Sequence, residues 1–138
     1  GFLARINNTG SGTLALTAAD SSSTLDFTSG ALAAFSNWYL GGGDGSTFTG
    51  SIVPAGSAYR FGGNGALTVA SNLGDGTSAR SLVVGNGNST GVIAFSGTNT
   101  YTGGTTLNSG VTIFQSPSAI GGSGQNLLVN APAAVASG

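Results

Sequence analysis

Few side chains in this sequence could carry acid–base, nucleophilic or metal chemistry. The sequence has no His, Cys, Lys or Glu, so most of the general bases and nucleophiles used by enzymes are absent. Four aspartates and three arginines remain, spread along the chain: Arg5, Asp20, Asp26, Asp44, Arg60, Asp75 and Arg80. Asp44 and Asp75 both precede Gly, a pattern that is typical of turns. We therefore expect no catalytic centre, no metal site and no cofactor.

The scarcity of charge also bears on the partners of the chain. Only 5% of the 138 residues are charged, against about 25% in ordinary domains, and the formal net charge is −1. Nucleic acids and anionic membranes both attract clustered Lys and Arg, so we expect neither as a partner. The longest apolar run, Ala31 to Phe35, is too short to cross a membrane. A surface with almost no charge does not repel other copies, which favours self-association.

The elements that must position these residues are predicted to be short β-strands. Gly, Ser, Thr and Asn make up more than half of the chain, and all four are poor helix formers. Only the stretch from Ala31 to Trp38 has a helix-like composition. Apolar residues instead recur at i and i+2, which places both on one face of a strand. The pairs are Leu14/Leu16, Leu25/Phe27, Tyr59/Phe61, Leu67/Val69, Leu82/Val84, Ile93/Phe95, Val111/Ile113 and Leu127/Val129.

Even spacing of short strands and turns favours a solenoid, in which each coil stacks on the one before it. Uncharged Thr, Ser and Asn tolerate being stacked on their own kind, whereas charges would repel one another. A coil of about 22 residues would give about six coils, in one domain over residues 1–138. A β-sandwich of pilin type is the alternative, and a closed barrel is a third possibility. In a solenoid, Asp20 and Asp44 would lie about one coil apart, which makes them the best pair for a carboxylate or calcium site.

One segment, residues 91–121, carries a recognisable motif. It contains Ser96-Gly97-Thr98-Asn99-Thr100-Tyr101-Thr102-Gly103-Gly104-Thr105-Thr106, followed by Asn108-Ser109-Gly110. This resembles the autotransporter-associated β-strand repeat, also called the passenger-associated transport repeat. The residues that carry the match are Gly97, Asn99, Tyr101, Gly103, Gly104, Thr105, Asn108 and Gly110. The resemblance implies a right-handed parallel β-helix in a secreted or surface-exposed bacterial protein.

The chemistry of the motif residues gives further expectations. We expect Gly97, Gly103 and Gly104 to permit turns with positive φ. Asn99 could bond its own backbone, and Tyr101 could cap a coil end with its hydroxyl in solvent. The chain should re-enter a strand at Thr105.

Three functions follow from these observations. The first is a rigid extracellular rod whose ends stack head to tail, because the sequence shows no obvious capping segment at Gly1 or at Gly138. Since no leader precedes Gly1, we expect either a mature subunit or part of a longer passenger. The second is an adhesin that binds glycans through a lateral face, with Trp38 and Tyr39 as candidate contacts. The third is a polysaccharide lyase-like enzyme, for which no cluster of acids with Arg60 or Arg80 is evident.

Overall fold

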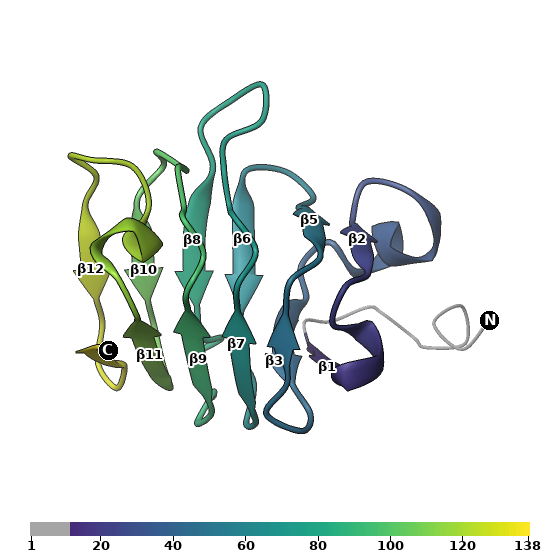
Figure 1. Cartoon of the computed structure of the whole chain (residues 1–138), viewed down its shortest axis with the longest axis horizontal. Helices are drawn as coiled ribbons and strands as arrows, with labels where there is room; N and C mark the ends of the chain where they lie inside the picture. The colour runs from purple at the N-terminus through teal and green to yellow at the C-terminus, as the bar shows by residue number, and fades with distance from the viewer. Residues whose placement is uncertain (1–11) are drawn as a thin grey trace.

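Short parallel strands joined by glycine-rich turns wind into coils that stack along one axis. The structure is a computed structural model that describes residues 12–138. It is a right-handed parallel β-helix of about five turns, with its earliest and latest coils at opposite ends (Figure 1). The predicted all-β solenoid is therefore confirmed, with about five turns where about six coils were predicted for residues 1–138. Every strand pair among residues 12–138 is parallel, which excludes the antiparallel sandwich.

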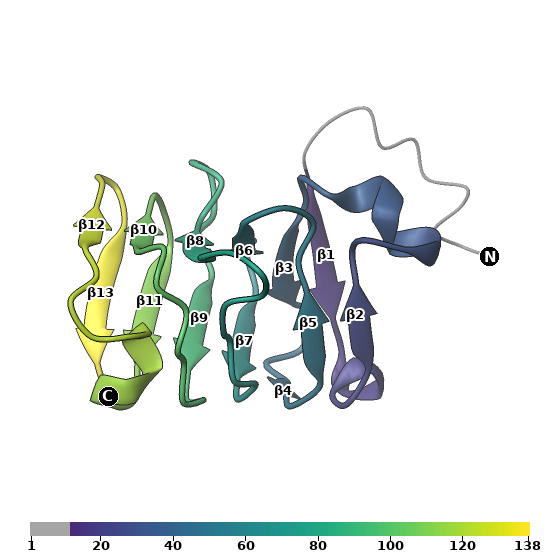
Figure 2. The same ribbon diagram turned by 90° about the horizontal axis from the view of Figure 1, so that it is seen from above.

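Two long sheets and one short sheet form the walls (Figure 2). The first sheet contains β1 (Thr13–Leu16), β3 (Tyr39–Gly42), β6 (Ala58–Phe61), β8 (Ser81–Val84), β10 (Thr105–Leu107) and β12 (Leu127–Val129). The second contains β4 (Thr47–Phe48), β7 (Ala66–Val69), β9 (Val92–Phe95), β11 (Val111–Phe114) and β13 (Ala134–Ser137). The short sheet pairs β2 (Thr24–Asp26) with β5 (Ser51–Val53).

Three short 3-10 helices complete the described coils: η2 (Ala18–Asp20), η3 (Gly30–Phe35) and η4 (Pro117–Ile120). The predicted helix-like stretch from Ala31 to Trp38 is replaced by η3, which begins one residue earlier and ends at Phe35. Its side chains nonetheless serve the core, because Phe35 is buried and Trp38 packs edge-on against it.

The register of the strands gives the length of a coil directly. In the first sheet Thr105 pairs with Leu82 on one side and with Leu127 on the other. These spacings are 105 − 82 = 23 and 127 − 105 = 22 residues, in agreement with the predicted repeat. Other strand pairs depart from it, with 39 − 13 = 26 residues between β1 and β3 and 111 − 92 = 19 between β9 and β11. Residues with the same place in successive coils therefore form columns that run along the axis.

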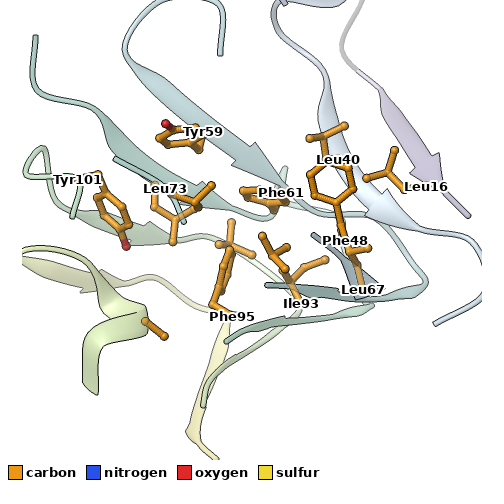
Figure 3. Packing of buried hydrophobic residues seen from close by; sticks show 14 of the residues in the cluster. Leu16, Leu40, Phe48, Tyr59, Phe61, Leu67, Leu73, Ile93, Phe95 and Tyr101 are labelled. Atoms are coloured by element: carbon orange, nitrogen blue, oxygen red, sulfur yellow. The ribbon is translucent and has the colours of Figure 1, made fainter. Parts of the chain in front are cut away.

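The core combines the inward-facing columns of the two long sheets with buried residues from the connecting segments, such as Leu73 and Tyr101 (Figure 3). Phe61 and Phe95 meet edge to face across the interior, with ring centroids 5.3 Å apart. Phe95 in turn stacks on Phe114 of the next coil, at 5.6 Å. The pairs Leu82/Val84 and Ile93/Phe95 are buried as alternation predicts.

One predicted inward pair is wrong. In β11 the buried residues are Thr112 and Phe114, while Val111 and Ile113 are only half-buried. The register explains this, because Thr112 pairs with Ile93 and Phe114 with Phe95, both of which face the core. Apolar residues occupy both faces of this strand, so alternation alone does not distinguish the faces.

Candidate functional site

Among the aspartates, Asp20 and Asp44 have carboxylates that accept from consecutive backbone N–H groups, those of Thr17 and Ala18. The register of β1 with β3 continues into the following turn and places Asp44 beside Ala18. The Ala18 N–H donates to the Asp44 carboxylate at 3.1 Å. Asp20 instead accepts from the Thr17 N–H and hydroxyl. The Ala18 N–H lowers the pKa of Asp44, with Ser46 contributing. Within residues 12–138, no three acidic side chains gather where they could share a metal ion.

The Asp75 carboxylate accepts hydrogen bonds from two successive coils. It accepts from the N–H of Arg80 at 2.7 Å, and in the next coil from the N–H and hydroxyl of Thr102, at 3.0 and 2.7 Å. The pKa of Asp75 is lowered first by the Arg80 N–H and then by the Thr102 hydroxyl. This carboxylate fixes one turn and joins it to the next coil, which is a structural task.

The two candidate glycan contacts point in different directions. Trp38 packs against the core and meets Phe35 edge-on, with centroids 4.9 Å apart. Tyr39 begins β3, and because Leu40 faces the core, Tyr39 lies on the outer face. The two neighbouring aromatics therefore do not form one stacking platform.

Asn99 joins three successive coils. Its Oδ1 accepts from the N–H of Leu73 in the preceding coil at 2.8 Å, and its Nδ2 donates to the carbonyl of Ala119 in the following coil at 2.5 Å. The side chain is buried. The expectation that Asn99 bonds its own backbone is wrong, because stacking brings backbone groups of both neighbouring coils within closer reach.

Tyr101 is also buried, which corrects the expectation of a hydroxyl in solvent. Its hydroxyl lies 2.7 Å from the Thr105 hydroxyl and donates to the carbonyl of Ile120, also at 2.7 Å. Burial raises the pKa of Tyr101 to about 12, and the bond to Thr105 acts in the opposite direction. Tyr101 thus fills the interior beneath η4 and links its coil to the next.

The motif glycines fall into two groups. Gly104 and Gly110 have φ of +88° and +76°, so Gly104 has the predicted positive φ. Gly97 and Gly103 do not, which corrects that prediction for both. They are required for a different reason: a Cβ at Gly97 would run into the Ser71 carbonyl, and a Cβ at Gly103 would lie 2.6 Å from the carbonyl oxygen of Arg80.

Sequence reasoning missed a serine ladder at the opposite corner. The buried Ser109 hydroxyl accepts from the N–H groups of Gly87 and Ser89, both at 3.1 Å. The Ser89 hydroxyl repeats this one coil earlier by accepting from Gly63 at 2.9 Å. Asn130 donates to Asn108 across the last two coils at 2.9 Å, which extends the polar ladder at this corner. The signal available in the sequence was the recurrence of Asn-Ser, at Asn88-Ser89 and Asn108-Ser109, about one coil apart.

The last coil leaves its inward side chains uncovered. Leu127, Val129 and Val135 are 41%, 42% and 44% exposed. Their partners one coil earlier are Thr105, Leu107 and Thr112, which are 2%, 0% and 0% exposed. The interior of the β-helix is therefore open at this end. The opposite end carries an apolar hollow of about 500 Å³ lined by residues such as Leu14, Leu16 and Trp38.

Comparison of the chain with known protein families, with curated proteins and with solved structures finds no match. Among the described residues, no helix has the length and apolar character to cross a membrane.

Proposed function

We propose that the chain is a structural β-solenoid, an almost uncharged rigid rod that is secreted or displayed on a bacterial surface and that assembles head to tail. The motif around Asn99 supports the surface setting through its resemblance to passenger repeats. A non-enzymatic role is supported by the work that the carboxylates of Asp44 and Asp75 already do in holding turns. Self-association is the partner class proposed, with no role for nucleic acid or membrane insertion.

The near absence of charge carries this proposal, together with the apolar columns that are exposed on the last coil that the structure describes. The three inward side chains of this coil, Leu127, Val129 and Val135, are each more than two-fifths exposed in columns that are otherwise buried. Covering them with another coil removes apolar surface from water, at roughly 25 cal/mol per Å². No charged residue follows Arg80, so no like charges oppose such contact at this end.

Sedimentation velocity and electron microscopy across a range of protein concentrations test the proposal. We expect rods of constant width whose length and mass increase with concentration. The double variant Leu127→Asp/Val129→Asp places charges on the open coil and should remain at the mass of one chain. The matched control, Thr106→Asp, adds an outward charge in mid-sheet and should assemble normally. Wild-type protein that stays at one-chain mass at every concentration would overturn the proposal.

A lateral adhesin is the second candidate, and the outward position of Tyr39 favours it. Arg60 also faces outward, on the neighbouring strand β6, so an aromatic ring and a cation share this face. Glycan-array binding that disappears in Tyr39→Ala, but persists in the assembly-deficient double variant, would support this role. An array without binding by wild-type protein would remove it.

A further inference from the structure

We propose that Arg80 binds the carboxylate of an acidic sugar in a polar groove on the side of the β-helix. The groove lies between the turn that joins β5 to β6 and the segment that joins β7 to β8, which rises beyond the neighbouring coils (Figure 1). Its volume is about 320 Å³, and its lining consists of Gly56, Ser57, Thr77, Ser78, Ala79 and Arg80. This binding site is additional to the proposed function, because it uses no surface at either end of the β-helix.

The Arg80 guanidinium is held in place by Tyr59 and Gly74. Its Nη1 donates to the Tyr59 hydroxyl at 3.0 Å and lies 3.5 Å from the carbonyl oxygen of Gly74. The Tyr59 hydroxyl donates to the same carbonyl at 2.7 Å. The guanidinium carbon lies 5.6 Å from the centroid of the buried Tyr59 ring, within the range of cation–π attraction. A cation that is already fixed loses little conformational entropy when it binds a ligand.

The other two guanidinium nitrogens, Nε and Nη2, have no hydrogen-bond partner in the described chain. Neither of them is buried, because the buried side-chain nitrogens and oxygens without a partner among residues 12–138 are confined to Thr112 and Gln125. Nε and Nη2 together form a flat edge of N–H donors that matches the two oxygens of a carboxylate. The half-buried Arg80 therefore keeps its carboxylate-binding edge open to a ligand.

The guanidinium charge of Arg80 is not used by the nearby Asp75. The Asp75 carboxylate accepts from the backbone N–H of Arg80 and from Thr102 rather than from the guanidinium. The pKa of Asp75 is lowered first by the Arg80 N–H and then by Thr102, with the attraction of the guanidinium contributing least. A single cation with Asp75 on the same segment favours a monoanion, because Asp75 repels a dianion such as phosphate more strongly.

The remaining walls of the groove suit a sugar ring. Ser57, Thr77 and Ser78 are exposed, and within the described residues their hydroxyls have no hydrogen-bond partner. Such hydroxyls both donate to and accept from the hydroxyls of a sugar. The volume is at the small end of the range of about 300–1,000 Å³ for small-molecule sites, so the groove suits one ring of a longer polysaccharide.

The Nε–H signals of the arginines in proton–nitrogen NMR spectra test this site, because the chain has only three arginines. Titration with glucuronate should shift the Nε–H signal of Arg80 and leave the other two in place, whereas glucose should shift none of them. Arg80→Lys keeps the charge but loses the flat edge, so the affinity for glucuronate should fall by roughly tenfold. The control Arg60→Gln removes a cation outside the groove and should bind glucuronate as wild type does.

A second pair of variants leaves the contacts of Arg80 with Tyr59 intact. Ala79→Asp adds a carboxylate to the wall of the groove, where it competes for the guanidinium, and should abolish binding of glucuronate. Ala79→Asn adds a side chain of nearly the same size without the charge and should retain binding.

Several results would overturn the proposal. These are equal responses to glucose and glucuronate, a shift at another arginine as large as that at Arg80, and an unchanged affinity in both Arg80→Lys and Ala79→Asp. Inorganic phosphate that binds as tightly as glucuronate would overturn the assignment to an acidic sugar. None of these results bears on the length of the rods, so the groove and the proposed assembly stand or fall separately.

Discussion

At the scale of single residues, the Asn99 side chain joins three successive coils. Replacing it with Ala leaves the Leu73 N–H and the Ala119 carbonyl buried without partners. We expect the free energy of unfolding to fall by about 2–4 kcal/mol, measured by urea denaturation. Asn88→Ala, at an exposed position, is the matched control and should change little. A loss below about 0.5 kcal/mol for Asn99→Ala would contradict this role.

Tyr101 gives the fold a dependence on alkaline pH. Its pKa is about 12 in the folded chain and about 10 in an unfolded one, so the folded state keeps the proton longer. The stabilisation is therefore complete below pH 10 and is lost as the pH rises towards 12, by about 3 kcal/mol. Tyr101→Phe should be less stable at neutral pH, and the difference from wild type should shrink across this window in urea titrations. A difference that stays constant with pH would contradict this assignment.

Thr112 is a buried hydroxyl whose Oγ1 has no hydrogen-bond partner in the described structure. Thr112→Val keeps the shape and removes the unsatisfied group, so we expect the protein to gain about 1 kcal/mol. The control Thr106→Val, on the outer face, should show no such gain. Thermal or urea unfolding measures both, and a destabilised Thr112→Val would indicate that the hydroxyl is satisfied in solution.

At the scale of elements, replacement by alanine distinguishes a glycine needed for close contact between coils from a glycine needed for its positive φ. Gly97→Ala inserts a Cβ against the Ser71 carbonyl of the neighbouring coil, so we expect a loss of ~3 kcal/mol or more. Gly45→Ala meets nothing within 4 Å and only forces Ala into φ +76°, which should cost about 1 kcal/mol. Equal losses in urea unfolding would contradict the assignment of Gly97 to close coil contact.

The strands and turns show which features of the fold can be predicted from the sequence and which cannot. Alternation predicts the inward face where a polar residue separates the apolar pair, as Thr68 does between Leu67 and Val69, and fails in β11, where Val111 and Thr112 both suit a strand interior. The assumed coil of about 22 residues agrees with the register among β8, β10 and β12. The partners of Asn99 and Tyr101 were not predictable, since they come from other coils and depend on register. The open end was also hidden, because Leu127 and Val129 have the same pattern as a buried pair.

At the scale of the whole molecule, stability and assembly have the same source. Each coil is held by backbone ladders, by stacked apolar columns and by side chains such as Asn99 and Ser109 that reach into neighbouring coils. A rod built from nearest-neighbour contacts has no internal reason to stop at a particular coil. The apolar columns exposed on the last described coil, and the near absence of charge, favour contact with a further coil.

Hydrogen exchange at the edge of β12 measures whether the last described coil is covered on assembly. We predict that the amides of Leu127 and Val129, which point away from β10, exchange fast in dilute protein and slow in step with the fraction assembled as concentration rises. The amide of Thr105 donates to Asn126 within the chain and should be slow at every concentration. Fast exchange of Leu127 and Val129 at all concentrations, beside a protected Thr105, would contradict the account.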